Sequence, residues 1–230
     1  MTDSTKGVAR RAFVGGLGVG AAVIGTEMAA APRANAAAAG RWQSSFDPKD
    51  DWLEIPGKHR LAFDATSADG AANALFFADN YIAANKSGYD LTESDLAVVI
   101  ILRHFATVFA YNDAMWKKYG IFFSTLTKFT DPKTKKAPQV NVYNSADYDK
   151  SRPPHGVTLP GLQKMGVRYA VCGMATAAFA GMMAKQGLGK ENEIHADLTA
   201  NLIPGSHLVA AGIVAVNRTQ EHGYAICSTG

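Results

Sequence analysis

Cysteine is scarce in this sequence, since only Cys172 and Cys227 carry thiols among 230 residues. A chain of this length can bury enough apolar surface to fold without disulfides, so neither cysteine is needed as a crosslink. No histidine pair has H-x-x-x-H spacing and no cysteine pair has C-x-x-C spacing, so local zinc signatures are absent. A P-loop and a G-x-S-x-G nucleophile elbow are absent as well. We therefore predict no metal and no other cofactor, although ligands from distant segments or neighbouring subunits could still gather in the folded protein.

A large excess of positive charge is also missing. The formal net charge is +3, from 23 basic and 20 acidic residues. Residues 1–36 hold four of the basic and two of the acidic residues, which leaves 19 and 18 in the remaining chain. Without a long basic face, this balance argues against a nucleic-acid partner. The chain after residue 36 also lacks an apolar run long enough to cross a membrane, so we predict no membrane span there.

The first 36 residues have the pattern of an export signal. Arg10 and Arg11 precede an uncharged, Gly- and Ala-rich run at 15–26, and an A-N-A sequence ends at Ala36. Together these features indicate a twin-arginine signal peptide. A disordered tail or a membrane anchor is the alternative, but five glycines interrupt the run, which is shorter than the about 20 residues of a membrane span. We expect cleavage after Ala36 and a periplasmic mature protein.

Strand and helix patterns alternate after an irregular lead-in at 37–57, whose Trp42 and Trp52 are expected to pin it to the domain. The unbroken apolar run Leu96–Leu102 is typical of a strand covered on both faces of a parallel sheet. We expect the strands at 58–64, 96–102, 167–171, 207–211 and 223–227. We expect the helices at 71–88, 107–119, 159–165, 174–186 and 214–222, with a helical turn in the connector 187–204.

This alternation predicts βαβ units with right-handed crossovers. The fold class is therefore α/β: a three-layer, flavodoxin-like domain at 58–230 with a mostly parallel sheet of about five strands. A polar stretch at 124–158, rich in Lys, Pro, Asn and Asp, interrupts the pattern as a long insertion. Loops of that length are usually functional or mobile.

Cys172 lies where a strand pattern changes into a helix pattern, within G-V-R-Y-A-V-C-G-M-A. A thiol at that junction faces the free N–H groups and partial positive charge of a helix N-terminus, which favour the thiolate. This is the position of a reactive cysteine. The alternative is a buried and inert cysteine, because free cysteines are among the most buried residues.

The block around Cys172 and the later block L-I-P-G-S-H-L-V-A-A-G-I-V-A-V-N-R-T-Q-E-H-G-Y-A-I together resemble the DsrE/DsrF-like family of sulfur-relay proteins. The likeness extends from Lys58 to Ile226, with motif matches over the final sixty-five residues and element order alone before them. Cys172 matches the single reactive cysteine of that family, at the end of a strand and before a helix of small residues.

The resemblance implies a small α/β domain that assembles into trimers or hexamers. It also implies that Cys172 accepts sulfane sulfur as a persulfide and exchanges it with donor and acceptor proteins. Three features differ from better-characterised relay members: the export signal, the insertion at 124–158, and the residues A-A-F-A at 177–180, where several members have arginines.

Other candidate site residues come from the ends of neighbouring strands, because open parallel sheets bind ligands at their carboxyl edge. His104 follows the second strand and is a candidate catalytic proton partner of Cys172; the alternative is a hydrogen-bonded histidine at a strand end. Thr66, Ser67 and Asp69 follow the first strand as candidate ligand contacts, although helix capping explains at least one of them.

Two further ligand contacts are predicted on helices. Gly173 opens the helix after Cys172, and Asn112 lies among aromatic residues on the helix expected at 107–119, where it could instead face solvent. We expect no Cys172–Cys227 disulfide. At least one strand should lie between the strands that carry the two cysteines, which gives a gap of about 10 Å, too long for an unstrained disulfide.

From these observations we expect an exported DsrE-like sulfur carrier or sulfurtransferase that uses Cys172. The alternative is a non-catalytic oligomeric module that binds a small ligand in the same sheet-edge pocket, with Cys172 as part of its wall. Fold alone does not separate the two.

Overall fold

The computed structural model describes residues 47–148 and 150–230, which belong to one compact unit. The predicted signal peptide at 1–36 and Trp42 lie outside the described residues. Among the residues that are described, no helix is both long and apolar enough to cross a membrane.

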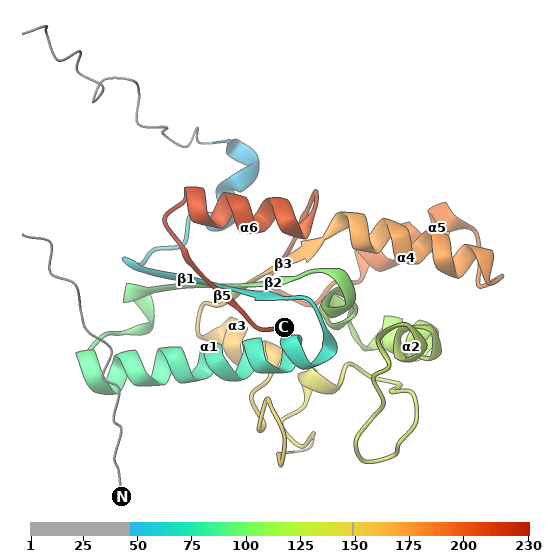
Figure 1. The fold of residues 1–230 in the computed structure, drawn as a ribbon, viewed down its shortest axis with the longest axis horizontal. Coiled ribbons are helices and arrows are strands. Elements are labelled where there is room, and N and C mark those ends of the chain that lie inside the picture. The colour runs from blue at the N-terminus through green and yellow to red at the C-terminus, as the bar shows by residue number, and fades with distance from the viewer. Residues whose placement is uncertain (1–46, 149) are drawn as a thin grey trace, which may run out of the picture. The chain divides into compact units, whose positions relative to one another are not determined.

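The centre of this unit is a five-stranded parallel sheet (Figure 1). Its strands are β1 (His59–Ala65), β2 (Leu96–Leu102), β3 (Arg168–Cys172), β4 (Ser206–Val209) and β5 (Ala225–Ser228). They lie in the order β4-β3-β2-β1-β5, with helices on both faces. The predicted α/β, three-layer, flavodoxin-like fold with a parallel sheet of about five strands is confirmed.

The central strand β2 has the bounds that its apolar run predicts, and all seven of its residues are buried. Alternate side chains enter two separate cores, because successive residues of a strand point to opposite faces. Val98, Ile100 and Leu102 belong to the larger core, whereas Val99 and Ile101 belong to the smaller one. Because both faces of β2 are buried, none of its residues has a polar side chain.

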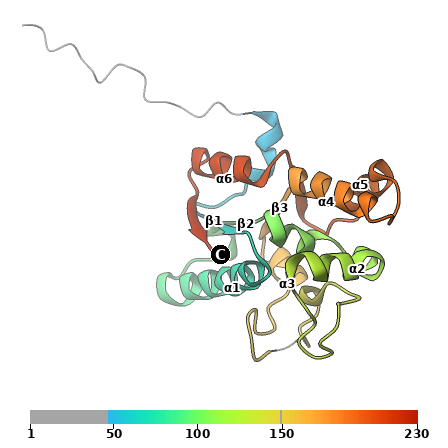
Figure 2. The ribbon, with the colours of Figure 1, turned by 45° about the vertical axis from the view of Figure 1, so that its right-hand side comes forward.

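The larger core lies under α1 (Ala68–Tyr89) and α3 (Leu159–Lys164), which cover one face of the sheet (Figures 1 and 2). Residues of α2 (Asp113–Thr127), α4 (Gly173–Lys185) and α5 (Glu191–Ala200) extend this core. Its largest side chains are aromatic, and several stack on one another, such as Tyr111 on Phe123 with ring centroids 5.5 Å apart.

The smaller core lies under α6 (Gly212–Glu221) on the opposite face, together with a 3-10 helix, η2 (Pro48–Leu53), from the lead-in. Trp52 is 6% exposed, so it holds the lead-in against the domain as expected. Two arginines secure the same segment: Arg60 donates to the carbonyl oxygen of Ile55 (3.1 Å), and Arg168 donates to that of Trp52 (3.0 Å). The lead-in thus forms part of the folded domain.

Two helix predictions differ from the structure. The helix expected at 107–119 is divided into a 3-10 segment, η4 (His104–Ala110), and α2, because the Asn112 side chain accepts from the N–H groups of Ala114 and Met115 and starts a new helix. The connector at 187–204 holds the full helix α5 in place of the expected single turn. Its buried Ile194 and Leu198 lie four residues apart on one face of the helix, and both belong to the larger core.

The insertion begins later than predicted, since α2 continues to Thr127. Within it, the side chain of Asn141 is buried and donates to the carbonyl oxygens of Phe109 (2.8 Å) and Tyr111 (2.9 Å). Asn141 therefore ties the insertion to the segment that precedes α2.

Candidate functional site

The strand register brings residues from distant parts of the chain to one edge. Leu102 of β2 lies between Ala65 of β1 and Val171 of β3, and Cys172 lies beside Val209 of β4. The segments that follow these strands therefore meet at the carboxyl edge, where open parallel sheets place their sites. The candidate site is centred on Cys172.

Cys172 is both the last residue of β3 and the N-cap of α4. Its Sγ accepts a hydrogen bond from the backbone N–H of Ala175 at 3.4 Å, so the sulfur takes the place of a serine or aspartate oxygen at the start of a helix. The residue is 7% exposed. The predicted passage from strand to helix at Cys172 is confirmed, and the sulfur faces the positive end of the helix dipole.

The hydroxyl groups of two buried residues, Thr176 and Tyr111, stabilise this turn. Thr176 donates to the carbonyl oxygen of Cys172 (3.0 Å), and Tyr111 donates to the hydroxyl of Thr176 (2.9 Å). Burial raises the pKa of Tyr111 well above its ordinary value, so its hydroxyl remains a donor. The chain of hydrogen bonds orients the first turn of α4, and with it the sulfur.

A positive charge near the sulfur comes from Arg103, the residue that follows β2. Its Nε and Nη2 donate to the two carboxylate oxygens of Asp64 at 2.6 and 2.8 Å, a bidentate pair that fixes the guanidinium. The pKa of Arg103 is raised, chiefly by this hydrogen bond and further by the charges of Asp64 and Cys172, against the opposing effect of burial. Sequence reasoning missed this pair as part of the site.

The strand pairing is the signal that could have revealed Asp64 and Arg103. Each stands at or just after the carboxyl end of a predicted strand, and the two strands are neighbours in the sheet. Helix α4, which follows the cysteine, carries no arginine, and the guanidinium near the sulfur comes from the residue after β2.

Two glycines allow close packing around the sulfur. A Cβ at Gly173 would lie 2.7 Å from the carbonyl oxygen of Val209, and one at Gly212 would lie 2.2 Å from the Cβ of Arg103. Gly173, predicted as a ligand contact, thus serves the approach of α4 to the end of β4. Gly212 is the first residue of α6 and packs directly against Arg103.

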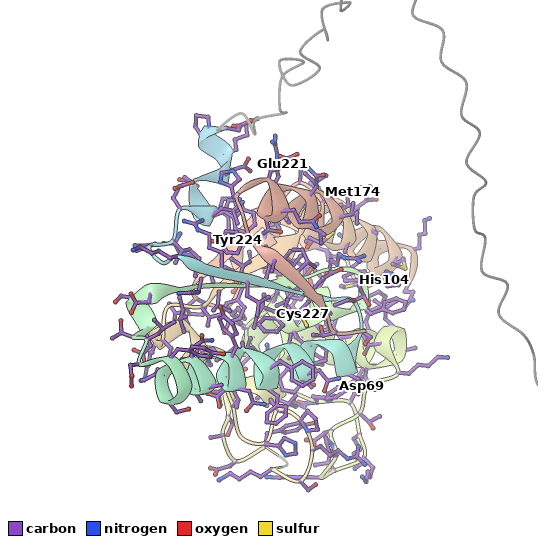
Figure 3. The ribbon with its side chains drawn as sticks, turned by 60° about the vertical axis from the view of Figure 1, so that its left-hand side comes forward. Asp69, His104, Met174, Glu221, Tyr224 and Cys227 are labelled. Atoms are coloured by element: carbon purple, nitrogen blue, oxygen red, sulfur yellow. The ribbon has the colours of Figure 1, made fainter. Side chains whose placement is uncertain are left out.

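His104 lies at this edge as predicted, at the first position of η4, with φ of 51°. Its side chain is exposed and stacks on Phe105 with ring centroids 3.9 Å apart. In the described part of the chain no hydrogen bond joins it to Cys172. Figure 3 shows His104 on the outside of the molecule, on the same side as Met174 of α4.

The predicted contacts after β1 are mainly structural. The Thr66 N–H donates to the carbonyl oxygen of Gly230 at 3.0 Å. Ser67 caps α1 by accepting from the N–H of Gly70 at 2.9 Å, which confirms that helix capping explains at least one of the predicted contacts. Both residues lie at the carboxyl edge with Cys172.

Asp69 and Asn112 lie elsewhere. Asp69 is exposed and lines a cavity of about 420 Å³ beside the insertion, together with Lys128 and Tyr148. Asn112 caps α2, and its Nδ2 donates to the Oδ1 of Asn201 at 3.1 Å.

Both cysteines are free thiols, and β2 and β1 lie between the strands of Cys172 and Cys227. Three strand spacings of about 4.8 Å place these strands farther apart than a disulfide can reach. Within residues 47–148 and 150–230, no group of three or more His, Cys, Asp or Glu side chains could hold a metal ion.

Exposed apolar side chains border the site. Met174, in the first turn of α4, is 69% exposed, and Ile213 and Val214, in the first turn of α6, are 61% and 46% exposed. The Met174 N–H donates to the carbonyl oxygen of Ala210, which joins the start of α4 to the segment that leads into α6.

No family model matches the chain, and no curated protein matches it. Among solved structures, a protein of unknown function, MTH1491 from Methanobacterium thermoautotrophicum, is similar with a TM-score of 0.38 and 13% sequence identity. The match covers 74% of this chain and 99% of that one.

Proposed function

We propose that this chain is an exported DsrE-like sulfur carrier that holds sulfur as a persulfide on Cys172. The observation that carries the proposal is the position of the Cys172 sulfur. It lies at the N-terminus of α4, where it accepts an N–H hydrogen bond, and close enough to Arg103 for the two charges to interact. A helix N-terminus and a neighbouring guanidinium are surroundings in which reactive cysteines occur.

The carrier reaction needs only a thiolate and a sulfane donor. The Cys172 thiolate attacks the outer sulfur of a donor persulfide, R–S–SH, and a new S–S bond forms as the donor's S–S bond breaks. The donor leaves as the thiolate R–S⁻, and Cys172 becomes a persulfide. Transfer to an acceptor thiol is the same step in reverse, so no net oxidant or reductant is consumed.

Access determines the kind of donor. Cys172 is buried, with 7% of its surface exposed, so the proposed loading requires a small persulfide or a terminal group that reaches into the edge. A donor or acceptor protein would rest on the exposed Met174, Ile213 and Val214. We include in the proposal that the mature chain forms a trimer or hexamer, and that residues 1–36 direct its twin-arginine export to the periplasm.

Mass spectrometry of the intact chain after brief exposure to polysulfide tests the carrier proposal. The wild type should gain one sulfur, about 32 Da, which a reductant removes. Cys172→Ser should gain nothing, whereas Cys227→Ser should load as the wild type does. Serine is a good N-cap, so the Cys172→Ser protein should also keep its stability.

An absence of any adduct, together with a Cys172 that resists alkylation in the folded protein, would contradict the carrier function. It would favour the alternative, a small-ligand-binding module in which Cys172 only lines the wall. Size-exclusion chromatography with light scattering on the same samples tests the oligomer, and a monomer would contradict that part of the proposal.

A further inference from the structure

A second cavity lies at the amino edge of the sheet, the edge opposite to Cys172. The strands β2, β3 and β4 begin there at Leu96, Arg168 and Ser206. This amino-edge cavity has a volume of about 700 Å³. That volume falls within the range of small-molecule sites.

The base of the amino-edge cavity is apolar, and one wall is aromatic. Ile55, Leu96 and Val167 line it and are at most 6% exposed. Beside them, the ring of Trp52 stacks on that of His207, with centroids 5.6 Å apart and planes at 12°. Such a lining suits a flat apolar group, which gains from burial and from contact with the rings.

The polar lining carries unbalanced positive charge. Arg168 and Lys164 line the cavity, and neither forms an ion pair with any residue of 47–148 or 150–230. Arg168 uses Nη1 to donate to the carbonyl oxygen of Trp52, which leaves further guanidinium N–H groups for a ligand. The one acidic residue of the lining, Glu93, is paired with Lys86 at 2.9 Å.

We propose that the amino-edge cavity binds a small molecule that carries an oxyanion, carboxylate or phosphate, on a flat apolar ring. The ring lies on the apolar base against the Trp52–His207 wall. The oxyanion accepts hydrogen bonds from Arg168 and pairs with Lys164. This site is separate from the cysteine, so the inference does not depend on the sulfur-carrier function.

Calorimetric titration of the full-length chain with four probes tests the inference. 1-Naphthyl phosphate and 1-naphthoate carry both the ring and an oxyanion, while 1-naphthol and inorganic phosphate carry one each. At least one of the first two should bind at least tenfold more tightly than 1-naphthol and inorganic phosphate. The difference between the first two probes tells phosphate from carboxylate.

Two matched lysine variants locate the site. Lys164 and Lys185 each lie in the last turn of a helix and are exposed, but only Lys164 lines the cavity. Lys164→Glu should weaken binding of the tighter-binding naphthyl anion at least tenfold. Lys185→Glu should leave the affinity for this anion unchanged. Amide chemical shifts should move at Val167 and Ser206 and stay constant at Ala175.

No binding of either naphthyl anion at millimolar concentration would overturn the inference. Equal affinities in wild type and Lys164→Glu would do the same, because the anion would then bind elsewhere. Cys172→Ser should bind like the wild type, so failure of sulfur loading leaves this result unaffected.

Discussion

At the scale of single residues, Cys172 depends on partners that lie far from it in the sequence. Its sulfur accepts a local N–H from Ala175, and the guanidinium nearby is that of Arg103, which Asp64 holds by two hydrogen bonds. A guanidinium held in this way keeps a fixed position, since both of its carboxylate contacts would have to break for it to move. Asp64 therefore fixes where the Arg103 guanidinium lies relative to the turn at Cys172.

Replacing Arg103 by glutamine should slow alkylation of Cys172 by iodoacetamide at pH 7 about three- to tenfold, because the thiolate loses a neighbouring positive charge. Arg218→Gln is the control. Arg218 pairs with Asp50 at 3.4 Å, and the side-chain exposures of this pair, 29% and 10%, are close to the 26% and 9% of Arg103 and Asp64. Equal rates in the two variants would remove Arg103 from the site.

At the scale of elements, the start of α4 is packed against the end of β4 through a glycine. Gly173 and Gly181 both lie in α4, but their surroundings differ. A Cβ at Gly173 would meet the Val209 carbonyl oxygen at 2.7 Å, whereas one at Gly181 would meet only the Glu191 carboxylate, at 3.5 Å or more. The first contact involves backbone that cannot turn away, and the second a flexible side chain.

Gly173→Ala should therefore destabilise the protein by about 1–3 kcal/mol through overpacking. Gly181→Ala should stabilise it by about 0.5–1 kcal/mol, because alanine loses less backbone entropy in a helix. Urea unfolding of the two variants beside the wild type measures both changes. A Gly173→Ala protein as stable as the wild type would show that the approach of α4 to β4 is looser than described.

At the scale of the whole molecule, buried tyrosines make stability depend on alkaline pH. Burial raises the pKa of Tyr111, Tyr143 and Tyr169 well above 10, and raises that of Tyr224 to about 12, partly offset by the charges of Arg60 and Arg168. Between pH 10 and these raised values the unfolded chain loses tyrosine protons that the folded chain keeps. The stability that these protonated tyrosines contribute is therefore fully present below about pH 10. The free energy of unfolding falls as the pH rises beyond that value.

Urea unfolding from pH 8 to 11.5 should show this loss, and Tyr169→Phe should reduce it by up to about 1.4 kcal/mol per pH unit above 10. The Tyr169 hydroxyl donates to the Leu159 carbonyl oxygen at 2.7 Å, so the variant should be less stable than the wild type at pH 8. An identical pH dependence in the two proteins would mean that Tyr169 does not contribute to the alkaline loss.

Local pattern determined the regular elements of this protein. The bounds of β2 follow from an unbroken apolar run, and the position of Cys172 follows from the change of period at one residue. These features depend on side chains within a few positions of one another, which is why sequence reasoning reaches them. Its errors fell at the division before α2 and at α5, where a side-chain cap and tertiary packing outweighed local preference.

Only the tertiary structure decided which residues make up the two sites, the one around Cys172 and the amino-edge cavity. Asp64 and Arg103 stand 39 residues apart, and Trp52 and His207 come from opposite ends of the described chain. Strand order and register bring these groups together, and both depend on how all the strands and helices pack at once. A pair that no local pattern contains becomes visible only when the sheet has formed.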